Sequence, residues 1–303
     1  MILTGIADEA GDGIDSQIAA TKALGWKHIE ARFLSVGEHE KGSIHEIPEE
    51  AFSLAVQALD EAGIKVCGIG STIGNWAHPI TDPYEITIGE VNRCIDRMKR
   101  LDSSIVRIMS YSIIEDENEN DHEDQLFEER VKRLKDIKNR FEDNGITPVH
   151  ENCMNFGGMS VSHALKLQNE IPDLKWVFDT GNPVFNADRS ASKPYPRQDA
   201  WRFYQEVKEQ IVHVHIKDGT WDKDKNECTF TMPGEGDGKV REILNDLKKS
   251  DYRGFISIEP HIASVFHEEA DEDINPIEKA KKQLETYVEY GRRLEKIISE
   301  ITV

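Results

Sequence analysis

Hydrophobic and polar positions follow a repeating order along the chain, in which short apolar runs alternate with longer amphipathic segments. An apolar run beginning at residue 2 is followed by residues 15–25, where Ile18 and Leu24 lie at helical spacing and Gly25 ends the segment. The short runs have the length of strands, and the longer segments have the period of a helix. The pattern therefore predicts units of one strand followed by one helix.

This unit recurs along the whole chain and gives eight predicted strands. No break in composition divides residues 1–303. The first strand is not followed by the G-x-G-x-x-G motif that is typical of a doubly wound open sheet that binds dinucleotides. Eight strand-helix units are what a (β/α)8 TIM barrel needs, so we expect a single barrel domain. The predicted strands begin at residue 2 and then cover 28–34, 65–72, 104–111, 146–153, 175–182, 211–218 and 254–260.

The composition of the chain excludes some classes of binding partner. The 303 residues include 37 Lys and Arg against 57 Asp and Glu, a formal net charge of −20. Such a charge repels phosphate backbones and anionic membranes, so we expect neither nucleic acid nor a membrane as a partner. The cysteines lack C-x-x-C spacing and the N-terminus lacks a signal-length apolar run, which favours a cytoplasmic protein. The sequence leaves the oligomeric state open, a homo-oligomer included.

Four consecutive predicted strands end in side chains that can bind a metal ion. Catalytic groups of such barrels lie at the carboxyl ends of the strands. The last inward positions of the fifth to eighth strands are Glu151, Asp179, His215 and Glu259. Any single one could instead cap a helix or pair with a cation. Together they would bury three like charges, which a bound cation would relieve.

This ligand set is rich in oxygen and suits a hard divalent ion. Three carboxylates and one imidazole favour Mn²⁺ or Mg²⁺, with Co²⁺ and Zn²⁺ as alternatives. An ion with only four protein ligands has positions left for substrate oxygens, such as a carbonyl and an adjacent hydroxyl. It would stabilise the enediolate formed when a proton leaves the carbon next to that carbonyl.

Five further residues are candidates for substrate binding. Lys217 shares a strand face with His215, although a salt bridge to a nearby acid is an equal interpretation. A tryptophan after the third strand could stack on a sugar or simply cover the barrel rim. His213, one layer deeper, is interpreted as a core or supporting residue. The candidates are Lys217, His261, Asn182, Trp76 and Glu30.

Three loop segments beside the predicted site are assigned no chemical role. The glycine-rich loop 233–238 does not match a phosphate-binding Walker pattern, so we expect a turn that brings the chain close to the pocket. The acidic runs 115–124 and 268–273 follow the fourth and eighth predicted strands. We expect both runs to be solvated loops at the active face.

Several of these segments together resemble the xylose isomerase-like TIM-barrel superfamily, in its sugar phosphate isomerase/epimerase branch. The resemblance spans essentially the whole chain, and its most specific parts are the His-x-Lys-Asp and Glu-Pro strand ends. The N-terminal segments 5–10 and 25–32 fit the same branch. The segments that carry it further along the chain are Glu151, 178–182, 213–218, 234–236 and 258–260.

The resemblance implies one divalent ion, often manganese, bound by Glu151, Asp179, His215 and Glu259. It also implies that Glu151 and Glu259 act as acid and base, as in ketose 3-epimerases, on a small carbohydrate or keto-sugar. We therefore expect an isomerase or epimerase. Asn182 stands where those epimerases have a substrate-binding histidine. This departure argues against a ketose 3-epimerase specifically.

Other functions use the same barrel. A dehydratase or lyase acting on a keto-polyol or a 3-keto-glycoside would pass through the same enediolate. A non-catalytic sugar-binding subunit would keep the barrel, but all four ligand positions are intact here. The endonuclease IV type of DNA repair enzyme needs further histidines, which the segments 107–111 and 219–231 do not supply. The net negative charge also disfavours a DNA substrate.

Overall fold

The described part of the chain, residues 1–118, 120–263 and 275–301 of a computed structural model, contains a sheet of eight parallel strands. Their order is β1-β12-β9-β8-β7-β6-β5-β2, and a bridge from Ile6 to Glu30 joins the two outer strands. The predicted single-domain (β/α)8 barrel is thereby confirmed. The strands are β1 (Ile2–Gly5), β2 (His28–Ala31), β5 (Lys65–Ile69), β6 (Ile105–Ile108), β7 (Thr147–Glu151), β8 (Lys175–Asp179), β9 (Ile211–Ile216) and β12 (Phe255–Ile258).

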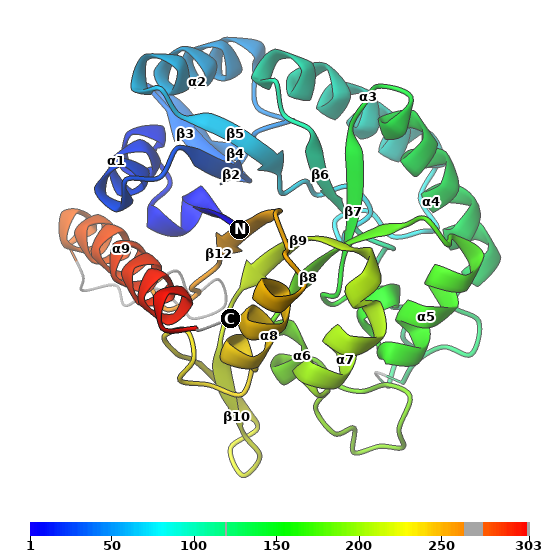
Figure 1. Cartoon of the computed structure of the whole chain (residues 1–303). Helices are drawn as coiled ribbons and strands as arrows, with labels where there is room; N and C mark the ends of the chain where they lie inside the picture. Colours follow the sequence, from blue (N-terminus) through cyan, green and yellow to red (C-terminus); the bar gives the residue numbers. More distant parts are fainter. Residues whose placement is uncertain (119, 264–274, 302–303) are drawn as a thin grey trace.

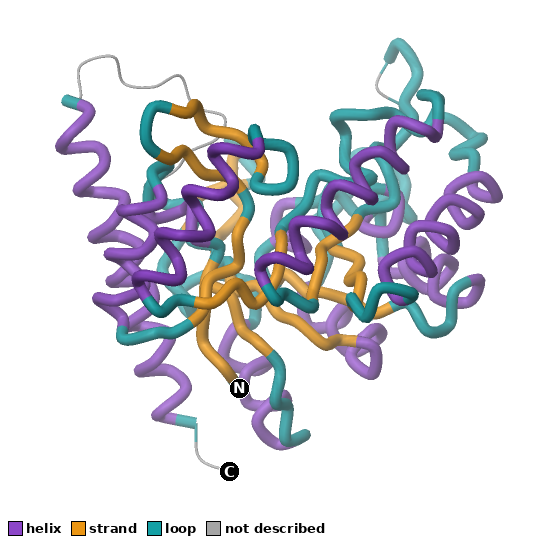
Figure 2. The backbone as a smooth tube through the Cα atoms, turned by 90° about the horizontal axis from the view of Figure 1, so that it is seen from above, coloured by secondary structure: helices purple, strands orange, loops and turns teal. Residues whose placement is uncertain are grey.

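Helices surround the strands on the outside of the barrel (Figure 1, Figure 2). The last helix lies beside the first, where Nε1 of Trp26 donates to Glu295 at 2.9 Å. None of the described helices is long and apolar enough to cross a bilayer. The helices are α1 (Ile14–Leu24), α2 (Glu49–Ala62), α3 (Tyr84–Leu101), α4 (Phe127–Glu142), α5 (Val161–Glu170), α6 (Asn182–Phe185), α7 (Ala200–Val207), α8 (Val240–Lys249) and α9 (Pro276–Glu300), with 3-10 turns η1 (Ala7–Ala10), η2 (Phe156–Gly158) and η3 (Lys208–Gln210).

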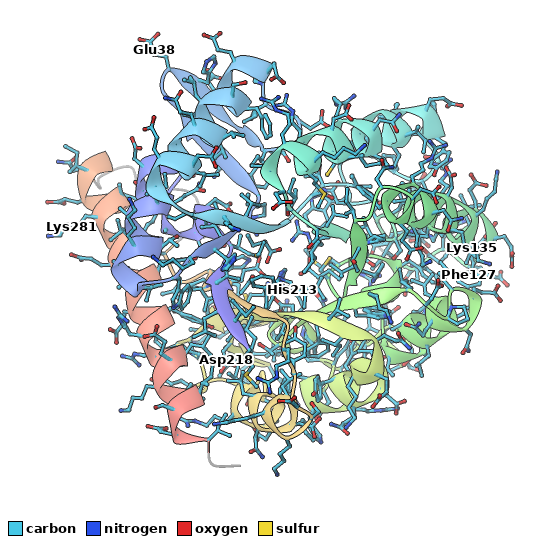
Figure 3. All side chains as sticks on the ribbon, turned by 45° about the horizontal axis from the view of Figure 1, so that its top comes forward. Glu38, Phe127, Lys135, His213, Asp218 and Lys281 are labelled. Carbon is cyan, nitrogen blue, oxygen red and sulfur yellow. The ribbon has the colours of Figure 1, made fainter. Side chains whose placement is uncertain are left out.

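The alternation of side chains along β9 shows how the sequence positions the site. Val214 and Ile216 are fully buried and belong to the apolar layer between strands and helices. Their neighbours His213 and His215 are equally buried but point to the opposite face, into the barrel. Figure 3 shows His213 near the centre of the molecule, far from the peripheral Lys281. The polar face of β9 therefore lies inside the barrel.

Two antiparallel hairpins were not predicted. The predicted strand 28–34 divides into β2 and β3 (Phe33–Val36), and β3 pairs with β4 (His39–Ser43). The loop 219–231 forms the hairpin of β10 (Gly219–Asp222) and β11 (Glu227–Phe230). β4 mixes charged residues and glycine without a period of two, and β10 and β11 have only four residues each, so no clear strand pattern marks these three segments.

The segment 183–198 begins inside the short helix α6 and contains a bridge between Ala187 and Arg197. The acidic run 268–273 lies outside the described residues.

Candidate metal centre

Glu151, Asp179, His215 and Glu259 meet at one end of the barrel. β7 and β8 end at Glu151 and Asp179, His215 is the penultimate residue of β9, and Glu259 directly follows β12. The strand registers place Asp179 beside His215 and His215 beside Ser257. One ligand atom from each of the four residues lies within 4.8 Å of the others. All four residues are buried, with at most 3% of their surface exposed.

Two atoms of this cluster lack a hydrogen-bond partner among the described residues. They are Nδ1 of His215 and Oδ2 of Asp179, although Nζ of Lys217 lies 3.2 Å from the latter as an ion pair. Nδ1 of His215 is 3.8 Å from Oε1 of Glu151 and 3.6 Å from Oε2 of Glu259. An unsatisfied buried polar atom costs roughly 1–3 kcal/mol, which a shared cation would offset. The donor set therefore fits a divalent ion.

Glu30, on the second barrel strand, contacts Nε2 of His215, the ring nitrogen that does not face the other three ligands. Nε2 of His215 lies 3.1 Å from both carboxylate oxygens of Glu30. The same carboxylate accepts from Nε2 of His213 at 2.7 Å and from Oγ of Ser257 at 2.6 Å. Because Nε2 of His215 is engaged by Glu30, the lone pair of Nδ1 faces the other three ligands. Glu30 was a candidate for substrate binding, and the structure places it behind the imidazole, 3% exposed.

Arg32 bridges the acidic groups around Glu259. Its Nη1 donates to Oε1 of Glu259 at 2.8 Å, its Nη2 to Glu9 at 2.9 Å, and its Nε to Asp8 at 3.1 Å. Glu9, Glu259 and His261 are themselves close enough to hold an ion. The guanidinium already supplies a positive charge to two of these three residues. A second ion at that position would have to compete with Arg32.

Arg107 donates a hydrogen bond to the carboxylate of Glu151, as Arg32 does to that of Glu259. Its Nη1 donates to Oε2 of Glu151 at 3.0 Å, and its Nη2 donates to the carbonyl oxygens of Gly70 and Ser71. Asn182 donates from Nδ2 to the other oxygen of Glu151, also at 3.0 Å. Both oxygens of Glu151 therefore have a fixed donor.

Lys217 and His261 reach the cluster, whereas Trp76 does not. Nζ of Lys217 lies 3.1 Å from Oε2 of Glu259, so its predicted alternative role as a salt-bridge partner is present in the site itself. The ring of His261 lies between acids, with Nδ1 at 2.8 Å from Glu9 and Nε2 at 3.7 Å from Glu259. Trp76 follows β5 and is 54% exposed, which leaves it on the rim.

Sequence reasoning missed Glu9, Arg32 and Arg107. Metal ligands are expected among acidic and histidine side chains at strand ends, and that pattern does not point to an arginine. A signal was present for Arg107, which interrupts the apolar strand Ile105–Ile108 at an inward position. A charged residue inside an apolar strand needs a buried partner, and here that partner is Glu151.

The charges of the cluster hold a proton on two of its candidate ligands, and a cation would have to displace these protons. Burial raises the pKa of Asp179 to about 7, against the opposing charge of Lys217. Burial alone would lower the pKa of His215, but the carboxylates of Glu30 and Glu151 outweigh it and raise the pKa to about 10. Both groups must lose their proton before they can bind an ion.

Metal affinity should therefore rise with pH. Below about pH 7 both Asp179 and His215 carry a proton that an ion must displace, and between about pH 7 and pH 10 only His215 does. We expect the Kd for Mn²⁺ to fall about tenfold per pH unit in that upper range, and more steeply below about pH 7. Calorimetric titration in two buffers of different ionisation enthalpy counts the protons released. An affinity independent of pH would contradict this assignment of ligands.

Comparison with known proteins gives one family. A family model described as xylose isomerase-like TIM barrel matches residues 18–290. None of the curated proteins matches the chain.

Solved structures share the fold at low identity. A 3-keto-D-glucoside 4-epimerase from E. coli has a TM-score of 0.63 at 13% identity, covering 98% of this chain and 100% of that one. A probable 3-DHS dehydratase from Bacillus anthracis has a TM-score of 0.62 at 15% identity, covering 94% and 98%. A xylose isomerase-like TIM barrel protein from Mycobacterium smegmatis, in complex with magnesium, has a TM-score of 0.63 at 15% identity, covering 98% and 97%. At these identities the likeness establishes the fold.

Proposed function

We propose that this chain, which belongs to the xylose isomerase-like TIM-barrel family, is a divalent-metal-dependent isomerase or epimerase of a small carbohydrate or keto-sugar. The observation that carries the proposal is the pair of buried glutamates, Glu151 and Glu259, whose nearest oxygens lie 3.8 and 3.6 Å from Nδ1 of His215. Two carboxylates beside one ion can remove a proton from a carbon next to a carbonyl and return it. Asp179 and His215 complete the ligand set.

The protein positions both glutamates for this exchange. The ion, when bound, stabilises negative charge on the substrate oxygens as a Lewis acid. Arg107 and Asn182 fix the carboxylate of Glu151, and Arg32 and Lys217 fix that of Glu259. Burial would raise the pKa of Glu151, but the charges of Arg107 and His215 lower it to about 2, so the group is ionised and can accept a proton.

The reaction then depends on where the proton returns. One glutamate takes the proton from the carbon next to the carbonyl, and the electron pair of that C–H bond moves into the enediolate. Return to the same carbon from the opposite face gives an epimer, and return to the adjacent carbon gives an isomer. If the enediolate instead expels a β-leaving group, the enzyme is a dehydratase or lyase. This is the second candidate, because a probable dehydratase has the same fold.

Proton exchange in D₂O tests the proposal. The metal-loaded protein is incubated with a panel of ketoses, aldoses and 3-keto-glycosides, and deuterium next to the carbonyl is followed by NMR. We expect exchange together with about one equivalent of divalent ion per chain, and none after chelation. A product that has lost water would identify the dehydratase. Bound metal without exchange on any panel member would favour a sugar-binding subunit, and three zinc ions would favour a nuclease.

A further inference from the structure

We infer that the substrate of this site carries no phosphate or carboxylate group and is a neutral polyol or keto-sugar. This inference rests on the proposed function and specifies its substrate class. The first support is that the cations of the described site are already matched by carboxylates of the protein. The pairs are Arg32 with Asp8, Glu9 and Glu259, Arg107 with Glu151, and Lys217 with Asp179 and Glu259.

The charge of the described cluster is unfavourable for an anion. The cluster holds six buried carboxylates against these three cations, so that with a divalent ion bound and the histidines neutral it keeps one negative charge. An anionic substrate would add like charge at low dielectric, where such contacts are costly. The carboxylates are Asp8, Glu9, Glu30, Glu151, Asp179 and Glu259.

The second support is the glycine-rich loop 233–238. In barrels of this class phosphate groups often bind to the loops after the seventh and eighth strands, and β9 is the seventh barrel strand. Here the loop's backbone N–H groups donate to the protein's own carboxylate, that of Asp218. Figure 3 labels this residue. The donors are Gly234 at 2.8 Å, Gly236 at 3.1 Å and Gly238 at 2.9 Å, joined by Gly219 at 2.9 Å.

The loop is shaped around this internal anion. A Cβ at position 236 would lie 2.4 Å from Oδ1 of Asp218, and one at position 238 would lie 2.9 Å from it. Asp218 is itself fully buried. Glycines are therefore required by the close approach to Asp218, and the amides that would bind a phosphate are already used.

Two arginines on the described loops around the active face, Arg189 and Arg197, are also engaged by other groups of the protein. Arg189 pairs with Glu115 and Asp121, and the guanidinium of Arg197 stacks 3.4 Å over the ring of Trp221. The residues outside the described part, 119, 264–274 and 302–303, include neither Lys nor Arg. An anionic substituent on the substrate would thus face acids more often than bases.

Phosphate titration tests the loop independently of any enzymatic activity. Mg²⁺-loaded protein with ¹⁵N-labelled glycine is titrated with inorganic phosphate while the four glycine amides are followed by NMR. We expect the wild type to show no saturable shift at these amides. Asp218→Ala frees the four N–H groups and should create such a shift, whereas the exposed control Asp222→Ala should not. Saturable binding at the wild-type loop would overturn the inference, even if Asp218→Ala fails to fold.

Matched substrates test the inference on the reaction. Deuterium exchange is compared between ketoses and the same ketoses with a terminal phosphate or carboxylate, such as D-fructose, D-fructose 6-phosphate and D-fructuronate. We expect kcat/KM to be at least about 100-fold lower for the charged members. Equal or preferred use of a charged member would overturn the inference while leaving the proposed function intact. Exchange on no member would instead count against the proposed function, and the phosphate titration would still decide the loop.

Discussion

Replacing Glu259 by glutamine should lower the rate of deuterium exchange by about 1,000-fold at saturating metal. The amide has nearly the same shape, and its one oxygen can accept from Arg32 or from Lys217, although not from both as the carboxylate does. It has no basic oxygen of comparable strength, so it cannot accept the proton from carbon. Exchange into the preferred ketose, followed by NMR at several metal concentrations, separates this effect from weaker ion binding.

A matched change on the surface controls for this result. Glu235 pairs with Arg293 and is exposed, so Glu235→Gln should leave the exchange rate within about twofold of the wild type. Circular dichroism of both variants checks that the barrel is intact. If Glu259→Gln exchanged protons at the wild-type rate, the mechanism with two glutamates would be wrong.

Replacing Glu30 by glutamine should weaken metal binding by about 10–100-fold. The carboxylate of Glu30 accepts from His213, His215 and Ser257 at once. An amide presents one oxygen and an NH₂ group that opposes the imidazole N–H, so His215 loses the contact that turns Nδ1 toward the ion. Calorimetric titration of the metal-free variant with Mn²⁺ measures this effect without reference to turnover.

Two comparisons distinguish orientation from general damage to the fold. Ser257→Ala removes one donor to Glu30 but leaves both imidazole contacts, so its metal affinity should fall by no more than a few fold. Glu235→Gln should leave the affinity unchanged. A wild-type Kd for Glu30→Gln would show that Glu30 does not orient His215.

The barrel could be predicted because its strands are buried on both faces and therefore read as apolar runs. The segment Ile211–Ile216 is an example, since its apolar side chains face the helices and its histidines interrupt the run at a period of two. The hairpin of β3 and β4 could not be predicted in the same way. Its second strand, His39–Ser43, contains no apolar side chain that would mark a buried face.

The four candidate ligands could be selected from the sequence because each ends a strand, and strand ends converge in a barrel. Arg32 could not be assigned a partner, because its contacts to Asp8 and Glu259 depend on the way the first and last strands meet. The contact of Glu30 with His215 could not be predicted from the sequence either. Only the three-dimensional arrangement shows that its side chain lies behind His215, where it contacts residues far along the chain.

The loop 233–238 shows the same limit. Its glycines predicted a turn, but the sequence did not reveal that the turn closes on Asp218. Three donors from a distant segment converge on that one carboxylate, and no local pattern records such a contact.

The contacts of Glu30 and Arg32 also set the order in which the protein can be assembled. Glu30 bonds to residues 183, 185 and 227 positions further along the chain, and Arg32 reaches Glu259 across 227 positions. Closing a loop of such length costs chain entropy before the contact can repay it, so we expect these contacts to form late in folding. A growing or truncated chain that lacks β12 has Glu30 and Arg32 but neither Ser257 nor Glu259. The complete set of four proposed ligands therefore exists only in chains whose first and last strands have met.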